Sequence, residues 1–579
     1  MSDLHQAISL ETVDTLKKRY VTFCGVKPKQ IRKAWLTDAL TNGLSDRSLL
    51  KPYLQTLSEL ELAFVQEAVF NYNGLIEKTR FEAKYGQFPE KPRGSGFFYY
   101  GSELSEPVEP FFYPQDKYGA LKIPDALRSS LKQLVDKPEP DVLQTAVLPD
   151  PLPDSHKVYE RERLTLSELR SLLILLQDKQ IKVSEKTGVA SSATLRKVSK
   201  DTHEYYETSS CKEASGMESI VSYGWLRLLG NSKLSKHSKT TLIPAKKAGD
   251  CTADTIKEIW DQWVKNRTHD EFRRIDNIKG QTGKGKRFFT DVVARRQVVI
   301  SALKECEVNA WVSFEDFSRL MFISGTELEI TKEPEYLYIH SPGYGEFYSA
   351  PWDIMEGRYL RCFLVEYAAT LGLIDVVMVP PDIDGTYYDD FGDMECLSRY
   401  DGLQFFRLTS LGAYVLGLAD SYRSGETDTT ETMLTIHRQG RIVFDENPTP
   451  WESRFLSLYA DQDKQNVWKL SRRKIMEALQ VGGSLDELKT FLLDREDQPF
   501  LPEDCESLLK QAEAHRDGVK IQGEYLIVTC KSQAIVDLVV NDKALSKWCQ
   551  RLGKLQIVIP ANKEKKFKGS INAMGIGCS

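Results

Sequence analysis

The clearest pattern in the chain is a stretch of apolar residues with helical spacing, followed by two short apolar strands. Residues 359–371 place apolar side chains three or four positions apart, which predicts a helix with one buried face. Gly372 then stands where helices commonly end in a left-handed residue. Residues 373–379 and 405–408 are rich in β-branched and aromatic side chains, which predicts two strands. Thr409 is suited to cap the helix that follows.

The order helix, strand, loop, strand, helix in residues 357–418 is the layout of a winged helix. We therefore assign residues 331–425 to a winged-helix domain. Its wing, from Asp382 to Asp401, is long and acidic. Because such a wing would repel phosphate, this copy is expected to have a structural or protein-docking role.

A looser helical pattern covers residues 159–330, which we assign to a winged-helix or helix-turn-helix region. Thr165–Glu168 has the sequence of a capping box and predicts the start of a helix, and Ile181–Val183 predicts a short strand. Two short helices at 184–189 and 191–200 then predict a helix-turn-helix, whose second helix is the one that contacts DNA.

Side chains suited to DNA contact gather at three places in this region. Hydroxyl, guanidinium and ammonium groups bond phosphates and base edges. The predicted DNA-binding residues are Ser192, Thr194, Arg196, Lys197 and Lys200 on the second helix, Lys233, Lys236 and Lys239 in a turn of a second copy, and Lys284, Lys286 and Arg287 in a basic loop. Protein docking remains open for the helix at 191–200, since winged helices in large assemblies also bind proteins.

The two ends of the chain differ from this middle part. Residues 1–88 predict a helical N-terminal domain, and the Pro- and aromatic-rich residues 89–158 predict an ordered connector. From residue 431, hairpin and helix signals alternate, which predicts a small mixed α/β domain over 431–560 and a flexible tail at 561–579. The expected fold class is therefore α+β and mostly helical, with tandem winged-helix domains before the mixed domain.

Short motifs follow one another in a distinctive order in the last quarter of the chain. They are the hairpin 434–444, the segment 468–479, residues 482–492, the segment 498–502, and strands within 519–528 and 555–559. In this order they resemble the N-terminal domain of XPB-type helicases and of related helicase-associated proteins of bacteria. Residues 159–420, particularly 164–198 and 407–417, are similar to the region that precedes this domain in the bacterial proteins.

The resemblance implies a clutch-like domain that docks on a superfamily-2 DNA helicase. The whole chain would then be a non-motor accessory protein of a DNA-translocating machine. Bacterial proteins of this kind often accompany anti-phage or DNA-repair systems.

Composition limits the partners and the compartment. The net charge is −6 and the pI about 5.9, so DNA contact must come from local basic patches. Ten cysteines without a C-x-x-C pair indicate reduced thiols. The chain start lacks a secretory signal, and no apolar run approaches the ~18 residues of a membrane span. These features predict a cytoplasmic protein without a membrane partner.

No convincing catalytic motif accompanies these domains. Gly280–Arg287 has the spacing of a phosphate-binding loop, but Arg287 stands where Ser or Thr would bind magnesium, and the sequence suggests no apolar strand before it. The acidic loop has Tyr387 where a calcium loop needs Gly, and the histidines match no metal pattern. We expect no catalytic, cofactor or metal site. A stand-alone winged-helix transcription regulator remains an alternative, as does a nuclease or NTPase with an unrecognised site.

Overall fold

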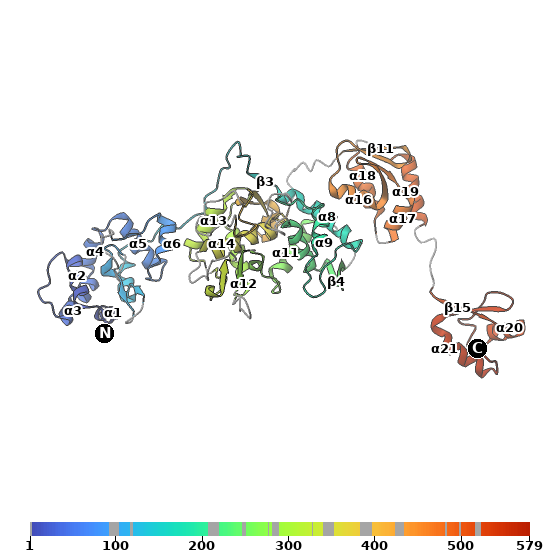
Figure 1. Ribbon diagram of the computed structural model, residues 1–579, viewed down its shortest axis with the longest axis horizontal. Coiled ribbons are helices and arrows are strands. Elements are labelled where there is room, and N and C mark those ends of the chain that lie inside the picture. The colour runs from blue at the N-terminus through green and yellow to red at the C-terminus, as the bar shows by residue number, and fades with distance from the viewer. Residues whose placement is uncertain are drawn as a thin grey trace. The chain divides into compact units, whose positions relative to one another are not determined.

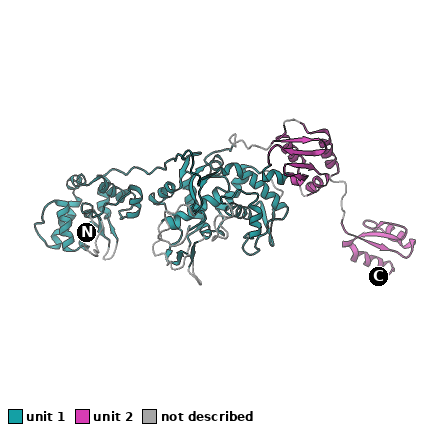
Figure 2. Cartoon of the chain, turned by 45° about the horizontal axis from the view of Figure 1, so that its top comes forward, with its two compact units in different colours: residues 1–432, 448–455 teal, residues 433–447, 456–579 magenta. Residues whose placement is uncertain are grey.

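The computed structural model of this chain is α+β and mostly helical, as the sequence predicts (Figure 1). It describes residues 3–91, 104–115, 120–206, 219–245, 251–275, 277–280, 289–326, 328–339, 352–381, 396–422, 433–480, 483–496, 500–515 and 523–578. The chain divides into two compact units, residues 1–432 with 448–455 and residues 433–447 with 456–579 (Figure 2). Over the described ranges, no helix has both the length and the apolar character to cross a bilayer.

The first part of unit 1 is a helical bundle around its own apolar core. Its helices are α1 (Asp3–Leu10), α2 (Val13–Cys24), α3 (Lys33–Ser45), α4 (Arg47–Leu54), α5 (Glu59–Phe70) and α6 (Lys78–Tyr85). Ser58 and Glu61 form a reciprocal capping box that starts α5. The bundle thus follows the helical pattern of residues 1–88.

The core of this bundle extends beyond the predicted boundary at residue 88. Phe111, Phe112 and Tyr113 are fully buried in it, and so is Leu131. The elements involved are η1 (Glu109–Phe111), β1 (Tyr113–Pro114), β2 (Leu121–Lys122) and α7 (Asp125–Leu131). Residues 104–115 and 120–135 therefore pack with the N-terminal helices rather than forming a connector, because their aromatic and aliphatic side chains complete that core. The aromatic segment 97–100 lies outside the described residues.

The middle of unit 1 contains two repeats of one topology. The first repeat consists of α8 (Arg161–Gln177), the strand segment 181–183, α9 (Ser192–Val198), α10 (Val221–Gly230), β4 (Ser235–Ser238) and β5 (Thr241–Pro244). β4 and β5 form an antiparallel hairpin. The segment 181–183 pairs with β5, since the N–H of Leu242 donates to the carbonyl of Ile181 at 3.0 Å. Helix α11 (Ala253–Val264) follows.

The second repeat has the same element order. It consists of α12 (Val292–Leu303), β7 (Trp311–Ser313), α13 (Phe314–Ile323), α14 (Trp352–Cys362) with the π-helical turn η4 (Phe363–Ala368), β9 (Ile374–Met378) and β10 (Leu403–Leu408). As in the first repeat, the first strand pairs with the third and the third with the second. β3 (Lys157–Tyr159) adds a fourth strand beside β9, and α15 (Ser410–Leu416) follows. Thr409 caps α15 as the sequence predicts.

Short elements complete the middle part. They are η2 (Glu271–Arg274), β6 (Ile278–Gly280), η3 (Pro334–Tyr336) and β8 (Leu337–Ile339). β6 pairs with β8 in an antiparallel two-stranded sheet.

The third helices of the two repeats pack against each other. Helix α10 lies on η4, and most of its residues are buried in the core that both repeats share. Gly224 makes the close approach possible, because a Cβ at this position would overlap the carbonyl oxygen of Glu366. The carboxylate of Glu204 caps α10 from outside the helix, accepting from the backbone N–H of Val221 at 2.9 Å and of Ser222 at 2.8 Å.

Two local predictions for the first repeat are wrong. The helix expected to start at the Thr165–Glu168 capping box begins at Arg161 instead. Glu168 does not cap, because it is buried and binds the guanidinium of Arg161 at 2.6 Å.

The first helix of the predicted helix-turn-helix is absent. Residues 184–189 form a tight loop in which the N–H of Ser184 donates to the carbonyl of Val189 at 2.8 Å. Gly188 has φ +63°, which breaks any helix there. The second predicted helix exists as α9, with Ser191 as its N-cap.

Unit 2 contains two mixed α/β parts. The first has the sheet order β11-β12-β14-β13. Its elements are β11 (Leu434–His437), η5 (Arg438–Gly440), β12 (Arg441–Phe444), β13 (Ala460–Lys464), β14 (Val467–Leu470), α17 (Arg472–Gln480), α18 (Leu485–Leu493) and α19 (Glu503–His515). Helix α16 (Pro450–Tyr459) begins in the 448–455 stretch that belongs to unit 1. The predicted hairpin at 434–444 is confirmed, and Ser484 caps α18.

The second part of unit 2 has a separate small core. Its elements are β15 (Tyr525–Thr529), α20 (Gln533–Asn541), β16 (Gln550–Arg551), β17 (Gln556–Pro560), η6 (Ala561–Lys563) and α21 (Glu564–Ala573), with strand order β15-β17-β16. The flexible tail predicted after residue 560 is wrong. Phe567 and Ile571 of α21 are buried in this core, so the hydrophobic effect orders the segment.

Candidate nucleic-acid interface

The β4–β5 hairpin presents a cluster of exposed basic side chains. Lys239 and Thr240 form its tight turn, and Lys239 adopts the left-handed φ of +53° that such turns require. Leu242 is fully buried and anchors the hairpin to the core. Lys236, His237 and Lys239 are exposed, so the predicted lysines lie together on one hairpin.

Lys233 precedes the hairpin and is exposed as well. Its ammonium lies 3.5 Å from the carboxylate of Glu258, but its side chain is 79% exposed. Because solvent screens such a surface pair, the pair is weak and a phosphate can compete for the ammonium.

Helix α9 keeps most but not all of its predicted contact residues on the surface. Ser192, Arg196, Lys197 and Lys200 are exposed. Thr194 is only 4% exposed, and its hydroxyl donates to the carbonyl of Lys182 at 3.0 Å. The prediction for Thr194 is therefore wrong, since this side chain holds α9 onto the neighbouring strand segment.

An acidic residue beside α9 is already neutralised. Asp201 lies close enough to Lys197 and Lys200 to interact with both electrostatically. Its carboxylate is buried and binds the guanidinium of Arg454 at 2.5 Å. Since Arg454 compensates this charge, the surface of α9 stays basic.

The predicted basic loop with Lys284, Lys286 and Arg287 lies outside the described residues. The segment before it differs from the sequence expectation, because β6 ends at Gly280. However, β6 is a strand of an antiparallel pair, whereas a phosphate-binding loop follows a strand of a parallel sheet.

The structure describes only the last part of the predicted acidic wing, Asp382 to Asp401. Residues 382–395 lie outside the described residues, whereas residues 396–401 are buried. Asp401 is 3% exposed and lies 3.2 Å from the guanidinium of Arg358. This part of the predicted wing is core structure, because its carboxylate completes a buried ion pair.

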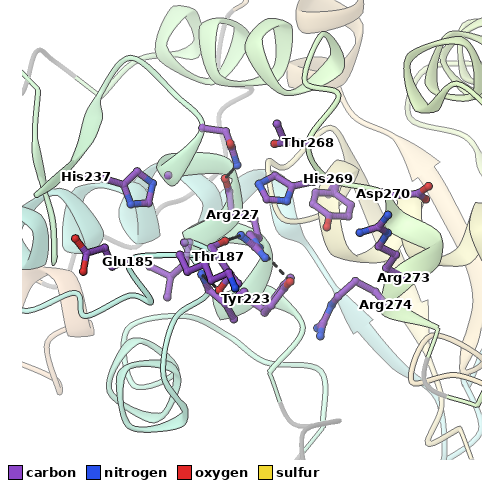
Figure 3. A pocket seen from close by; sticks show the side chains of 17 residues that line it. Glu185, Thr187, Tyr223, Arg227, His237, Thr268, His269, Asp270, Arg273 and Arg274 are labelled. Atoms are coloured by element: carbon purple, nitrogen blue, oxygen red, sulfur yellow. Dashed lines mark hydrogen bonds between the residues drawn. The ribbon is translucent and has the colours of Figure 1, made fainter. Parts of the chain in front are cut away.

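A cationic cleft lies next to the hairpin. Its volume is about 630 Å³. It is lined by Glu185, Lys186, Thr187, Gly188, Val189, Tyr223, Leu226, Arg227, Gly230, Asn231, His237, Thr268, His269, Asp270, Arg273, Arg274 and Tyr367. Figure 3 shows Arg227 in the middle of the cleft, with His237 on one side and Arg273 and Arg274 on the other.

Two arginines are held in place around Tyr223. The guanidinium of Arg274 lies 3.5 Å from the centre of the Tyr223 ring, and its Nη2 lies 2.8 Å from the carboxylate of Glu366. Arg227 donates from Nε to the Tyr223 hydroxyl at 3.0 Å and from Nη1 to the carbonyl of Thr187 at 3.2 Å. These contacts fix the arginine side chains before any ligand binds.

The charges of the cleft do not cancel. The Asp270 carboxylate binds the guanidinium of Arg295 at 2.6 Å, and Arg274 is paired with Glu366. This leaves Lys186, Arg227 and Arg273 facing the single carboxylate of Glu185. The cleft is therefore suited to an anion.

His269 adds no charge to the cleft at neutral pH. Burial, together with Arg227, Arg296 and Arg273, lowers the pKa of its imidazole to about 4. Its neutral ring can donate or accept a hydrogen bond there.

Sequence reasoning missed the cleft. It drew no function from Arg227, Arg273 or Arg274, and of the histidines it said only that they match no metal pattern. The one local signal was the adjacent pair Arg273–Arg274, whose meaning depends on the distant Tyr223.

No protein-family model matches the chain, and no curated protein is similar to it in sequence. Across the described residues, no group of three or more His, Cys, Asp or Glu side chains could hold a metal ion. The function must therefore be argued from the chain itself.

Proposed function

We propose that this chain is a non-motor accessory subunit that binds DNA through two winged-helix domains and docks a superfamily-2 helicase. The topology of the two repeats supports the winged-helix assignment. Each repeat has the order helix, strand, helix, helix, strand, strand, which extends the layout predicted for residues 357–418. Its first strand pairs with the third, and a hairpin or long connection joins the second and third strands.

One observation carries the DNA-binding part of the proposal. The hairpin of the first repeat, in the position of a wing, exposes Lys236, His237 and Lys239, and the nearby α9 exposes Arg196 and Lys197. Lysine and arginine on exposed, mobile side chains bind phosphates, and such contacts dominate affinity for nucleic acid. The basic residues are therefore concentrated at one place. A chain with a negative net charge needs such a local patch to bind DNA.

We take α10 as the recognition helix in place of α9, because the helix predicted at 184–189 is absent and α9 is then the first helix of the pair. The mode of binding follows from the burial of α10. A helix that reads bases enters the major groove and needs a free polar face. Most of α10 is packed into the core, and Arg227, which remains on its surface, faces the cleft. We therefore propose contact with the phosphate backbone, without base readout.

The helicase-docking part rests on unit 2. Its hairpin β11–β12, helices α17 and α18, and closing strands β15 and β17 follow the order of elements that resembles the N-terminal domain of XPB-type helicases. In that family the domain binds the motor protein, so unit 2 is the proposed docking surface.

Charge reversal on the hairpin tests DNA binding. Lys236→Glu combined with Lys239→Glu removes two phosphate contacts and adds repulsion, so affinity for a labelled duplex should fall by at least about a hundredfold at 0.1 M salt. The measurement is fluorescence anisotropy over a salt series. Lys17→Glu, an exposed lysine of the N-terminal bundle, serves as the control and should bind like the wild type. Unchanged affinity in the double variant would refute the hairpin as the interface.

Helicase docking is tested separately by purifying the tagged full-length chain from its own cells. A superfamily-2 helicase should co-purify with the full chain and be absent when residues 433–579 are deleted. Absence of a helicase from the full-length sample would remove this part of the proposal and leave the DNA-binding part intact.

A further inference from the structure

The cleft beside the hairpin has features of a built anion site. Lys186, Arg227 and Arg273 face it without compensating carboxylates apart from Glu185. Its volume of about 630 Å³ falls in the range of ligand sites, but its lining is mostly polar and cationic. An apolar ligand therefore does not match it.

The guanidinium groups have donors to spare. The side chain of Arg273 is exposed, and its guanidinium makes no hydrogen bond or ion pair with the part of the chain that the structure describes. Arg227 uses Nε and Nη1 for Tyr223 and Thr187, which leaves Nη2 free of a protein partner among those same residues. Guanidinium groups bind phosphate through pairs of parallel N–H donors, and the guanidinium of Arg227, which Tyr223 and Thr187 hold in place, loses little entropy when it does so.

The cleft and the hairpin form a continuous surface. His237 belongs to β4 and also lines the cleft, and its ring lies directly beside Gly188, another lining residue, where an added Cβ would stand 3.1 Å from it. A nucleic-acid strand that contacts Lys236 and Lys239 is therefore within reach of the cleft.

We propose that this cleft binds a phosphate group of the nucleic acid held by the hairpin. Arg227 and Arg273 supply the paired donors and Lys186 supplies further positive charge. The guanidinium of Arg274 covers one face of the Tyr223 ring at 3.5 Å and closes that face to base stacking. The site is thus a phosphate site rather than a base pocket. The statement that the bound phosphate belongs to a nucleic acid rests on the proposed function. The statement that the cleft binds a phosphate does not.

The test uses the full-length chain with Arg273→Gln, an exposed residue whose loss should not disturb folding. Affinity for labelled DNA should fall about tenfold at 0.1 M salt, and the slope of log affinity against log salt should decrease by about 0.9, as for one lost phosphate contact. Arg267→Gln is the matched control. Its side chain is 71% exposed and does not line the cleft. Lys186→Gln is the second variant if Arg273→Gln fails to fold, as judged by circular dichroism.

A second arm separates the two sources of phosphate. Inorganic pyrophosphate is titrated into the wild type and Arg273→Gln by calorimetry, without DNA. If Arg273→Gln binds DNA normally but loses pyrophosphate binding, the phosphate site stands and its ligand is a free phosphorylated molecule.

If Arg273→Gln matches the wild type in both arms, the cleft proposal is overturned. The hairpin variants decide the proposed function independently. The double variant Lys236→Glu with Lys239→Glu could bind DNA weakly while Arg273→Gln binds like the wild type. That result would support the proposed function and contradict the phosphate site in the cleft.

Discussion

Glu356 of α14 is a carboxyl group whose charge the fold disfavours. Burial raises its pKa to about 7, although its carboxylate accepts the backbone N–H of Ile330 at 3.3 Å. Because the folded-state pKa lies above the ordinary value near 4.5, the folded protein binds a proton that the unfolded chain has released. This contribution to stability is fully present below about pH 4.5 and is lost as the pH rises through 7.

Glu356→Gln should therefore remove a pH dependence. The amide is neutral at every pH and its oxygen can still accept from Ile330. The variant should melt with the wild type at pH 4.5 and at a higher temperature at pH 8, with a gain of at most about 3 kcal/mol. Scanning calorimetry at both pH values measures the difference, with the exposed Glu307→Gln as control. Equal midpoints at pH 8 would show that Glu356 ionises freely in the folded protein.

At the scale of single elements, the packing of α10 on η4 gives a prediction with a distinctive sign. Alanine is favoured over glycine in a helix by about 1 kcal/mol. Gly224→Ala should nonetheless destabilise the protein by about 1–3 kcal/mol, because the added Cβ overlaps the carbonyl oxygen of Glu366. Gly230→Ala in the same helix is the control, since its Cβ would find no atom nearer than 3.8 Å. Thermal melting compares the two, and a stabilised Gly224→Ala would mean that the helices are not in contact.

Elements set by local signals were predictable from the sequence. The cap at Thr409 and the hairpin over 434–444 depend on residues close together in the sequence, and both are confirmed. The failures involve distant partners. Glu168 looked like a capping residue because its partners lie beyond the spacing of a capping box: Arg161 is seven residues earlier in α8, and Trp225 belongs to α10.

The candidate site also has one part that the sequence reveals and one part that it does not. The hairpin lysines lie within seven positions of one another, so their charge pattern is visible in the sequence. The cleft is not visible, because Arg227 and Arg273 stand on different elements and meet only after the chain folds. The burial of the Thr194 side chain likewise depends on Lys182, which lies on the neighbouring strand segment.

At the scale of the whole molecule, the packing of the two third helices against each other bears on whether the protein reads a DNA sequence or binds only the DNA backbone. A regulator that recognises an operator needs a free recognition helix. In this chain α10 and η4 cover each other, so we expect selection from random DNA sequences to return no consensus. Binding should also depend steeply on salt, as backbone contacts do. A recovered consensus would contradict the backbone mode and favour the transcription regulator.

The contact between Gly224 and Glu366 also determines how the gene can be divided. One apolar core runs from Tyr159 to Leu416 through both repeats, so each repeat supplies part of the interior of the other. A fragment boundary between residues 280 and 289 looks natural from the duplicated topology, but it would leave both halves with exposed core. The two repeats therefore act as halves of a split protein, which must be expressed as one piece or mixed to regain a common fold.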